Sequence, residues 1–296
     1  MPRFGQVITA MVTPFHKDGS LNLDGAKRLA RWLQDNGNDG LVIAGTTGEA
    51  PVLTDDERLS LFKAVVEAVT IPVIAGTGTN DTAHSIHMTK EASKLGVAGI
   101  LAVTPYYNRP SQTGIDAHMR AVCAATTLPV VIYDIPVRTG RKINTPTLAK
   151  LANEVKNVAG VKDAAGNPAE SARLMTMVPK SFELISGDDG LTLPLMAVGC
   201  TAVIGVATHW SGVDHQEMFK KWNAGDTAGA RAVNARLVES FAFETGDDNP
   251  NPLPTKAMMN HLGLDVGDAR LPMGPPPAGL AERAAQVMKN LVAARR

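Results

Sequence analysis

This sequence of 296 residues has few cysteines, few aromatic residues and no net charge. Its two cysteines, Cys123 and Cys200, are too few for a disulfide framework and lack the CxxC spacing of a metal site. Aromatic residues make up 4%, and Lys+Arg and Asp+Glu are both 29, so the formal net charge is +0. No overall field therefore attracts the chain to nucleic acid or to an anionic membrane. We expect no nucleic-acid partner, no metal site and a reducing cytoplasm as the location.

Long apolar segments and nucleotide-binding motifs are also missing. The longest apolar stretch, residues 191–207, contains a proline and two glycines and is shorter than a membrane span. The N-terminal residues 1–15 lack a long apolar core and a cleavage site, so we expect neither a signal peptide nor membrane association. Gly76-Thr77-Gly78 is followed by Asp81 where a dinucleotide-binding motif has its third glycine. We expect no cofactor.

The sequence does contain a repeated strand and helix unit, with 44% hydrophobic residues to form a sizeable core. Between the apolar runs lie helix starts, including a capping box at residues 54–57, Asn80-Asp81, and Thr145 as N-cap before Pro146. The mean interval of about 28 residues suits a βα unit and predicts a closed (β/α)8 barrel, with a doubly wound sheet as the alternative. The apolar runs begin near Gln6, Leu41, Val73, Ile100, Val130, Val158, Phe182 and Ala202.

The strand signals stop near residue 207, and the rest of the chain has helical patterns. Residues 211–224, 226–242, 255–262 and 278–293 are predicted helices, and prolines separate them. We therefore expect a TIM barrel over residues 1–225 and a helical C-terminal domain over residues 226–296.

Polar residues follow the predicted strands, at the end where all eight strands of a barrel converge. All three tyrosines of the chain, Tyr106, Tyr107 and Tyr133, lie in these segments. A tyrosine at one strand end is more often a half-buried rim residue, but three together favour a chemical role.

Lys162 ends a short apolar run, residues 158–161, and precedes a helix start at residues 167–170 with Asn167 as N-cap and Pro168 at N1. Most lysines are solvated surface charges, which is the alternative interpretation. An amine projecting into an apolar barrel mouth is instead a candidate Schiff-base nucleophile. For this role its pKa, normally about 10.4, must fall toward neutrality, which requires burial.

Neighbouring strand ends offer suitable partners. The loop Gly45-Thr46-Thr47-Gly48-Glu49 has closely spaced backbone N–H groups and two hydroxyls for a small carboxylate, although in isolation it is equally typical of a plain turn. The phenol of Tyr133 can transfer protons while a carbinolamine loses water. Arg138 can hold a second carboxylate, although an isolated arginine is more often solvated.

The motifs GTTGE, TPYYN, YDIPVRTG, GVKDAAGN and SGDD occur in this order, and KAMMNHLGL and ARLPMGP follow near the C-terminus. Together they resemble the pyruvate-dependent Schiff-base lyase and aldolase family over nearly the whole chain. The resemblance implies a TIM barrel in which Lys162 forms an imine with pyruvate, and the enamine then adds to L-aspartate 4-semialdehyde in lysine and diaminopimelate biosynthesis. It also implies a homotetramer built from two tight dimers.

The same resemblance implies roles for further residues. Thr47 helps to hold the pyruvate carboxylate, and Arg138 binds the carboxylate of the semialdehyde. Tyr133, Thr46 and Tyr107 form a proton relay, with Tyr107 reaching the site of the partner subunit. Gly187 and Ile204 match backbone positions near the site.

Two positions depart from the family pattern. Asp134 stands where Asn is common, and Ala165 stands where Thr, Ser or Lys is frequent. An alternative function is another lyase of the family, such as N-acetylneuraminate lyase or a 2-keto-3-deoxy-sugar-acid aldolase. Thr46, where the sialate enzymes have Ser, and Arg138 favour the short carboxylated aldehyde. A catalytically silent barrel that only binds ligands would be expected to lack Lys162 or the tyrosines, and none is missing.

L-Lysine, the end product of the implied pathway, should inhibit this protein weakly or not at all. The sensitive relatives carry Glu where this chain has His84, and losing that charged partner costs roughly 1.5–3 kcal/mol of lysine binding. Initial rates at saturating substrates, titrated with lysine into the millimolar range, measure this. Strong sub-millimolar inhibition would show that another carboxylate, such as that of Asp55, replaces the glutamate. The possible effector site comprises Ala50, Pro51, Asp55, Arg58, Asn80, His84 and Tyr106.

Overall fold

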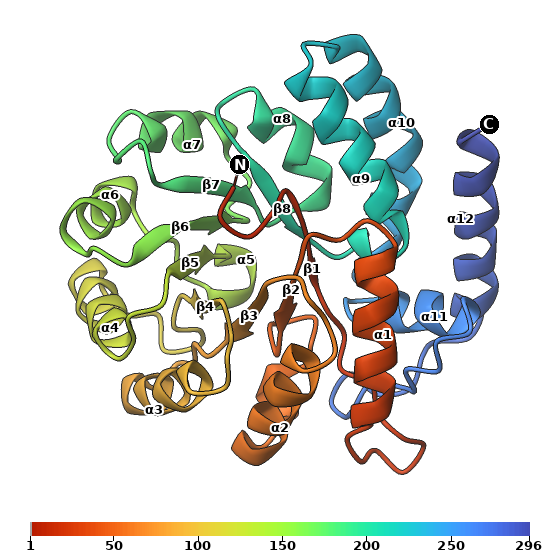
Figure 1. Cartoon of the computed structure of the whole chain (residues 1–296), viewed down its shortest axis with the longest axis horizontal. Coiled ribbons are helices and arrows are strands. Elements are labelled where there is room, and N and C mark those ends of the chain that lie inside the picture. The colour runs from red at the N-terminus through yellow and green to blue at the C-terminus, as the bar shows by residue number, and fades with distance from the viewer. Residues whose placement is uncertain (1) are drawn as a thin grey trace.

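Eight parallel strands close into a barrel in the computed structural model, which describes residues 2–296 (Figure 1). Neighbours along the chain pair in order, and β8 closes the ring on β1 through Val203 and Val7. The (β/α)8 prediction is confirmed, and the doubly wound alternative is wrong. The strands are β1 (Val7–Ala10), β2 (Gly40–Ile43), β3 (Val73–Gly76), β4 (Gly99–Val103), β5 (Val130–Asp134), β6 (Val158–Asp163), β7 (Glu183–Ser186) and β8 (Ala202–Gly205).

Helices surround the barrel and cover the outer face of its strands (Figure 1). Alternate strand side chains point to opposite faces, so the apolar runs build two cores. A small cluster around Ile8, Ile74 and Ile185 fills the barrel interior, and a larger one joins the strands to the helices. The helices of this layer are α1 (Leu23–Asp35), α2 (Asp55–Val66), α3 (Thr82–Ser93), α4 (Gln112–Ala124), α6 (Thr145–Glu154), α7 (Pro168–Met175), α8 (Thr192–Met196) and α9 (Thr208–Asn223), with short 3-10 turns at Ala50–Val52 and Asp189–Leu191. The short helix α5 (Pro136–Thr139) lies inside this ring, at the mouth of the barrel (Figure 1).

Three more helices follow, α10 (Thr227–Phe243), α11 (Leu253–His261) and α12 (Leu280–Ala294). They gather on one side of the barrel, where α10 packs against α9 and α12 (Figure 1). The four predicted C-terminal helices are thus present, with ends shifted by a few residues. The predicted domain division at residue 225 stays a prediction. Among residues 2–296, no helix has the length and apolar character to cross a bilayer.

The predicted helix starts are confirmed, except for the N-cap at Thr145. Thr54 and Glu57 form the capping box of α2, and the side chain of Asn167 caps α7. Thr145 is not an N-cap: α6 already includes it, and the extended Asn144 is the cap, without a side-chain bond. The short helix α5, within YDIPVRTG, was not predicted because four residues show no helical period.

A buried ion pair joins the loop after β2 to the C-terminal helices. Lys256 Nζ lies 2.8 Å from Glu49 Oε1, and both side chains are almost fully buried. The other carboxylate oxygen of Glu49 accepts a hydrogen bond from the Arg270 backbone N–H at 2.9 Å. Glu49 itself has a left-handed backbone, with φ of 58°. The contacts of its carboxylate therefore hold a strained turn in place.

Lys256→Met should lower the free energy of unfolding by about 3–5 kcal/mol, because it leaves the Glu49 carboxylate buried without its partner. The comparison is Lys94→Met, which breaks a pair with Glu91 whose two side chains are 66% and 33% exposed. That loss should be about 0–1 kcal/mol. Urea denaturation followed by circular dichroism at one fixed protein concentration measures both. Equal losses in the two variants would contradict the stabilising role of the buried pair.

Candidate active site

Lys162 and Tyr133 face each other inside the mouth of the barrel. They are register partners on β6 and β5, each one residue before the end of its strand. Both are 4% exposed, and Lys162 Nζ lies 4.2 Å from the centre of the Tyr133 ring. The lysine is therefore a buried amine, and the solvated alternative is wrong.

Burial lowers the pKa of Lys162 to about 8, with the charge of Arg138 acting in the same direction. The nearby carboxyl groups of Asp189 and Glu244 act in the opposite direction. At pH 7 roughly one amine in ten is then neutral, compared with fewer than one in a thousand for a solvated lysine. The neutral form is the one that attacks a carbonyl.

Gly187, directly after β7, makes room for the lysine side chain. A Cβ atom at this position would lie 2.9 Å from Lys162 Cγ and 3.1 Å from Ala164 Cβ. Its backbone N–H donates to the Asp163 carbonyl at 2.8 Å, which joins the ends of β6 and β7. A larger residue here would displace the amine.

A cavity of about 470 Å³ opens in front of Lys162. Thr46 and Thr47 of the loop after β2 line one part of it, and the segment after α10 lines another. Thr47 Oγ1 accepts a hydrogen bond from Asn251 Nδ2 at 2.8 Å. Because a hydroxyl that accepts one bond can still donate, the Thr47 proton remains available to an oxygen in the cavity.

Arg138 lies on α5 at the exposed rim of the same cavity. Burial raises the pKa of Tyr133, while the Arg138 charge and the Thr46 hydroxyl act in the opposite direction. The phenol is therefore protonated at neutral pH and can act as a proton donor.

Two further predicted site residues, Tyr107 and Ile204, do not line this cavity. Tyr107 follows β4, is 89% exposed and has a left-handed backbone with φ of 72°. Ile204 is fully buried, and its side chain belongs to the apolar cluster inside the barrel rather than to the cavity wall.

Three buried polar residues, Asp189, His215 and Glu244, were not predicted from the sequence as site residues. Asp189 lies 3.4 Å from His215 Nε2 and accepts a hydrogen bond from the Val206 N–H at 2.7 Å. Glu244 lines the cavity and accepts from the Ala207 N–H at 2.9 Å. Asp189 belongs to the SGDD motif, but nothing in the sequence connects it with residues from α9 and from the end of α10.

The pKa values of Glu244 and Asp189 shift in opposite directions. Burial and the nearby Asp189 charge raise the pKa of Glu244 well above its usual value. Burial acts against ionised Asp189 too, but hydrogen bonding and the charge of His215 bring its pKa below the usual value. These shifts favour a protonated Glu244 beside an ionised Asp189, and a protonated Glu244 adds no second negative charge next to Lys162. Within residues 2–296, no group of three or more His, Cys, Asp or Glu is placed to hold a metal ion.

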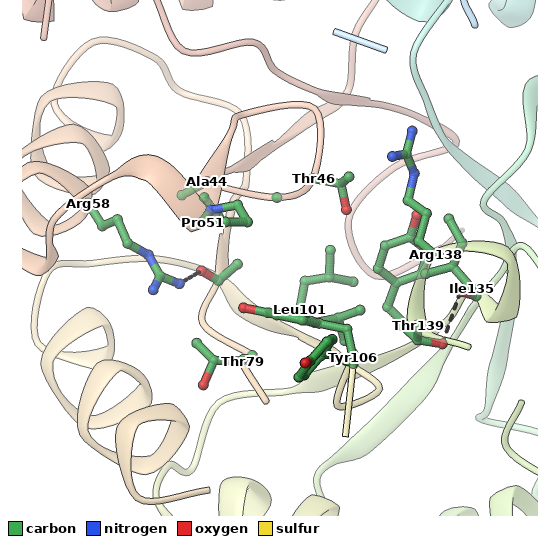
Figure 2. Close-up of a pocket in the computed structure, with 17 residues that line it drawn as sticks. Ala44, Thr46, Pro51, Arg58, Thr79, Leu101, Tyr106, Ile135, Arg138 and Thr139 are labelled. Carbon is green, nitrogen blue, oxygen red and sulfur yellow. Dashed lines mark hydrogen bonds between the residues drawn. The ribbon is translucent and has the colours of Figure 1, made fainter. Parts of the chain in front are cut away.

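A second cavity, of about 330 Å³, adjoins the first, and Figure 2 shows it between Arg58 on one side and Thr46 and Arg138 on the other. Arg58 is buried and donates to the Gly76 carbonyl at 2.6 Å. Of the possible effector residues, Ala50, Pro51, Arg58 and Tyr106 line this cavity, whereas Asp55, Asn80 and His84 do not.

Asp55 and His84 are paired with each other, at 2.8 Å between Oδ1 and Nε2. The backbone carbonyl of Asn80 accepts from Asn108 Nδ2 at 2.9 Å. The structure therefore gathers only part of the predicted effector site around one cavity.

The model of the dihydrodipicolinate synthetase family matches residues 3–293. The chain belongs to the dihydrodipicolinate synthetase family. This match confirms the resemblance seen in the sequence motifs.

Relatives within the family agree over nearly their whole length. The chain is 49% identical to 4-hydroxy-tetrahydrodipicolinate synthase of Moorella thermoacetica over 275 residues, covering 92% of each chain. The crystal structure of the Cyanidioschyzon merolae family member with lysine bound superposes with a TM-score of 0.95 and 39% identity, covering 99% of each chain. The structure of the chloride-inhibited Acinetobacter baumannii enzyme complexed with pyruvate has a TM-score of 0.91 and 32% identity, covering 98% of this chain and 99% of that one.

Proposed function

We propose that this protein is a 4-hydroxy-tetrahydrodipicolinate synthase that condenses pyruvate with L-aspartate 4-semialdehyde through an imine on Lys162. The observation that carries the proposal is the buried Lys162 amine, whose pKa of about 8 leaves a reactive neutral fraction at neutral pH. The names of its relatives at up to 49% identity favour the same activity.

In the proposed reaction, neutral Lys162 attacks the keto carbon of pyruvate and releases its oxygen as water. The imine then loses a methyl proton to become an enamine, which forms the new carbon–carbon bond with the aldehyde of the second substrate. Tyr133, Thr46 and Tyr107 relay the protons. Protonated Tyr133 beside the amine suits the delivery of a proton to the departing water.

Two residues that line the cavity are suited to binding carboxylates. Thr47 keeps its hydroxyl proton available because it accepts from Asn251, and this favours a role in holding the pyruvate carboxylate. Arg138 at the rim is suited to the semialdehyde carboxylate, which arrives second. Gly187 serves by leaving space beside Lys162.

Borohydride with pyruvate should trap a covalent adduct on Lys162, and its initial rate should rise with pH through about 8 as the amine loses its proton. Intact-mass analysis and peptide mapping locate the adduct. Lys162→Ala should abolish trapping and most turnover while the circular dichroism spectrum is retained. An adduct on another lysine would contradict the mechanism.

Turnover of pyruvate with L-aspartate 4-semialdehyde should exceed cleavage of N-acetylneuraminate or 2-keto-3-deoxygluconate in the same preparation. Faster cleavage of either sugar acid would assign the protein to another activity of the family.

For the assembly, we propose a homotetramer of tight dimers in which Tyr107 completes the relay of the partner subunit. A tyrosine side chain that is 89% exposed on a strained backbone supports a contact outside its own chain.

Mixing Tyr107→Phe subunits with Lys162→Ala subunits should restore part of the activity, because one site of each hybrid dimer then contains both intact groups. Subunit exchange is monitored by native mass spectrometry. No recovery despite demonstrated exchange would contradict the contribution in trans.

Regulation by lysine is proposed to be weak or absent in this protein. Asp55 is engaged by His84, and the guanidinium of Arg58 lines the cavity that a lysine ammonium would have to enter. A reducing cytoplasm remains the proposed location, since Cys123 and Cys200 are buried and unpaired.

A further inference from the structure

A chain of ion pairs lies on the outer side of β5 and β6, behind the two reactive residues. Asp134 and Asp163 are register partners, directly after the partners Tyr133 and Lys162. Side chains alternate along a strand, so the two carboxylates point out of the barrel while the phenol and the amine point in. The outer side chains are therefore one residue away from the chemistry.

Asp134 closes the base of the loop that carries Arg138. Its Oδ1 accepts a hydrogen bond from the Ile143 backbone N–H at 3.1 Å, and its Oδ2 lies 3.4 Å from Lys142 Nζ. Residue 134 precedes the loop and residues 142 and 143 end it, so one carboxylate joins the two ends. Arg138, on α5, lies midway between them.

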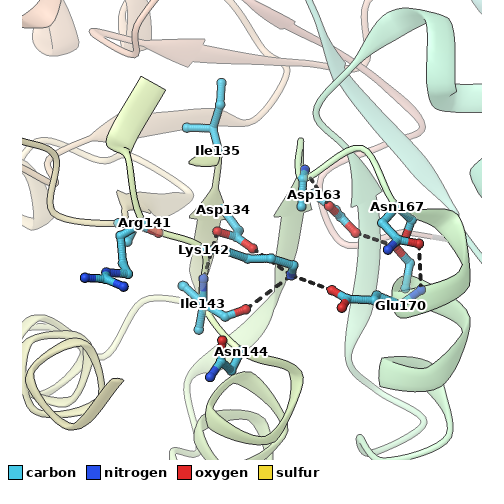
Figure 3. Close-up of polar contacts among 12 residues, drawn as sticks. Asp134, Ile135, Arg141, Lys142, Ile143, Asn144, Asp163, Asn167 and Glu170 are labelled. Carbon is cyan, nitrogen blue, oxygen red and sulfur yellow. Dashed lines mark hydrogen bonds and ion pairs between the residues drawn. The ribbon is translucent and has the colours of Figure 1, made fainter. Parts of the chain in front are cut away.

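Lys142 extends the connection to the next helix. Its Nζ lies 3.1 Å from Glu170 Oε2 on α7 and donates to the Ile143 carbonyl at 3.2 Å (Figure 3). Figure 3 shows the ammonium between Asp134 and Glu170. We call Asp134, Lys142 and Glu170 the outer ion chain.

The Asp134 end of this chain is almost fully buried, whereas Glu170 is 47% exposed. Burial raises the pKa of Asp134 to about 6, against the opposing effect of the Lys142 charge and the Ile143 N–H. Asp134 is therefore ionised at pH 7.5 to 8. A buried carboxylate next to an ammonium constrains geometry more strongly than an exposed pair does.

We propose that Asp134 and Lys142 are positioning residues that hold the Arg138 loop in register with Lys162, and so set the affinity for the second substrate's carboxylate. This inference rests on the proposed function. It assigns a purpose to Asp134, the position where the family pattern has Asn: an amide of the same shape can still accept from the Ile143 N–H but cannot pair with the Lys142 charge.

The kinetic test compares Asp134→Asn and Lys142→Met with wild type at pH 8. Each should raise the semialdehyde KM about three- to tenfold and leave the rate of borohydride-trapped pyruvate imine within about twofold. The double variant should be less damaging than the product of the two single effects, because both changes remove one shared ion pair. Glu170→Gln should change the KM less than about twofold, since that pair is half exposed.

Two further variants show how large a change in the semialdehyde KM should be regarded as significant. Arg138→Ala, which removes the proposed carboxylate ligand itself, should raise the same KM about 30- to 1,000-fold. Lys221→Met is the matched control: its side chain is 34% exposed, against 33% for Lys142, and it also bridges two carboxylates, those of Glu217 and Asp226. It should leave the semialdehyde KM unchanged. An unchanged KM in Asp134→Asn and Lys142→Met, or equal damage to imine formation, would overturn the proposal.

Amide hydrogen exchange gives a readout that needs no turnover. Exchange in residues 135–143 should be faster in Asp134→Asn and Lys142→Met than in wild type, and unchanged in Lys221→Met. If wild type fails to use the semialdehyde, the proposed function fails, and the exchange result still decides whether the outer ion chain holds the loop. Unchanged exchange in both variants would overturn the positioning role whatever the activity.

Discussion

The burial of one amine is the constraint on which the rest of the site depends. Lys162 is 4% exposed, and its pKa falls to about 8 because the barrel mouth excludes water from the ammonium form. Strand pairing places the Tyr133 ring beside it, and a glycine at position 187 leaves the space it needs. The lowered pKa therefore follows from the closed parallel sheet rather than from a local motif alone.

Two carboxyl groups near Lys162 partly offset the effect of burial on its pKa. Burial and the Asp189 charge raise the pKa of Glu244, whereas hydrogen bonding and the His215 charge outweigh burial and lower that of Asp189, which favours one negative charge near the lysine rather than two. A second full charge would favour the ammonium form and lower the fraction of neutral amine. The end of α10 thus contributes to the electrostatic environment of a lysine more than 80 positions earlier in the chain.

The C-terminal helices also hold the loop after β2. Asn251 bonds to Thr47, and Lys256 pairs with the buried Glu49 carboxylate on the same loop. A loop with two strained non-glycine residues, Ala44 and Glu49, needs such support to keep one conformation. Asp134 and Lys142 join the ends of a second loop at the cavity, the one that carries Arg138. Both loops thus have a polar support behind them.

The barrel and the approximate start of each strand could be predicted from the residues alone, because apolar runs at a regular spacing with helix caps between them report local periodicity. It also indicated Lys162, since a lysine ending an apolar run is visible in one dimension. The folded chain was needed to show that Glu244 lines the cavity of that lysine, that His215 lies beside Asp189, and that Asp55 pairs with His84. Contacts between distant segments depend on how helices pack around the barrel, and packing leaves no periodic signal in the residues that it brings together.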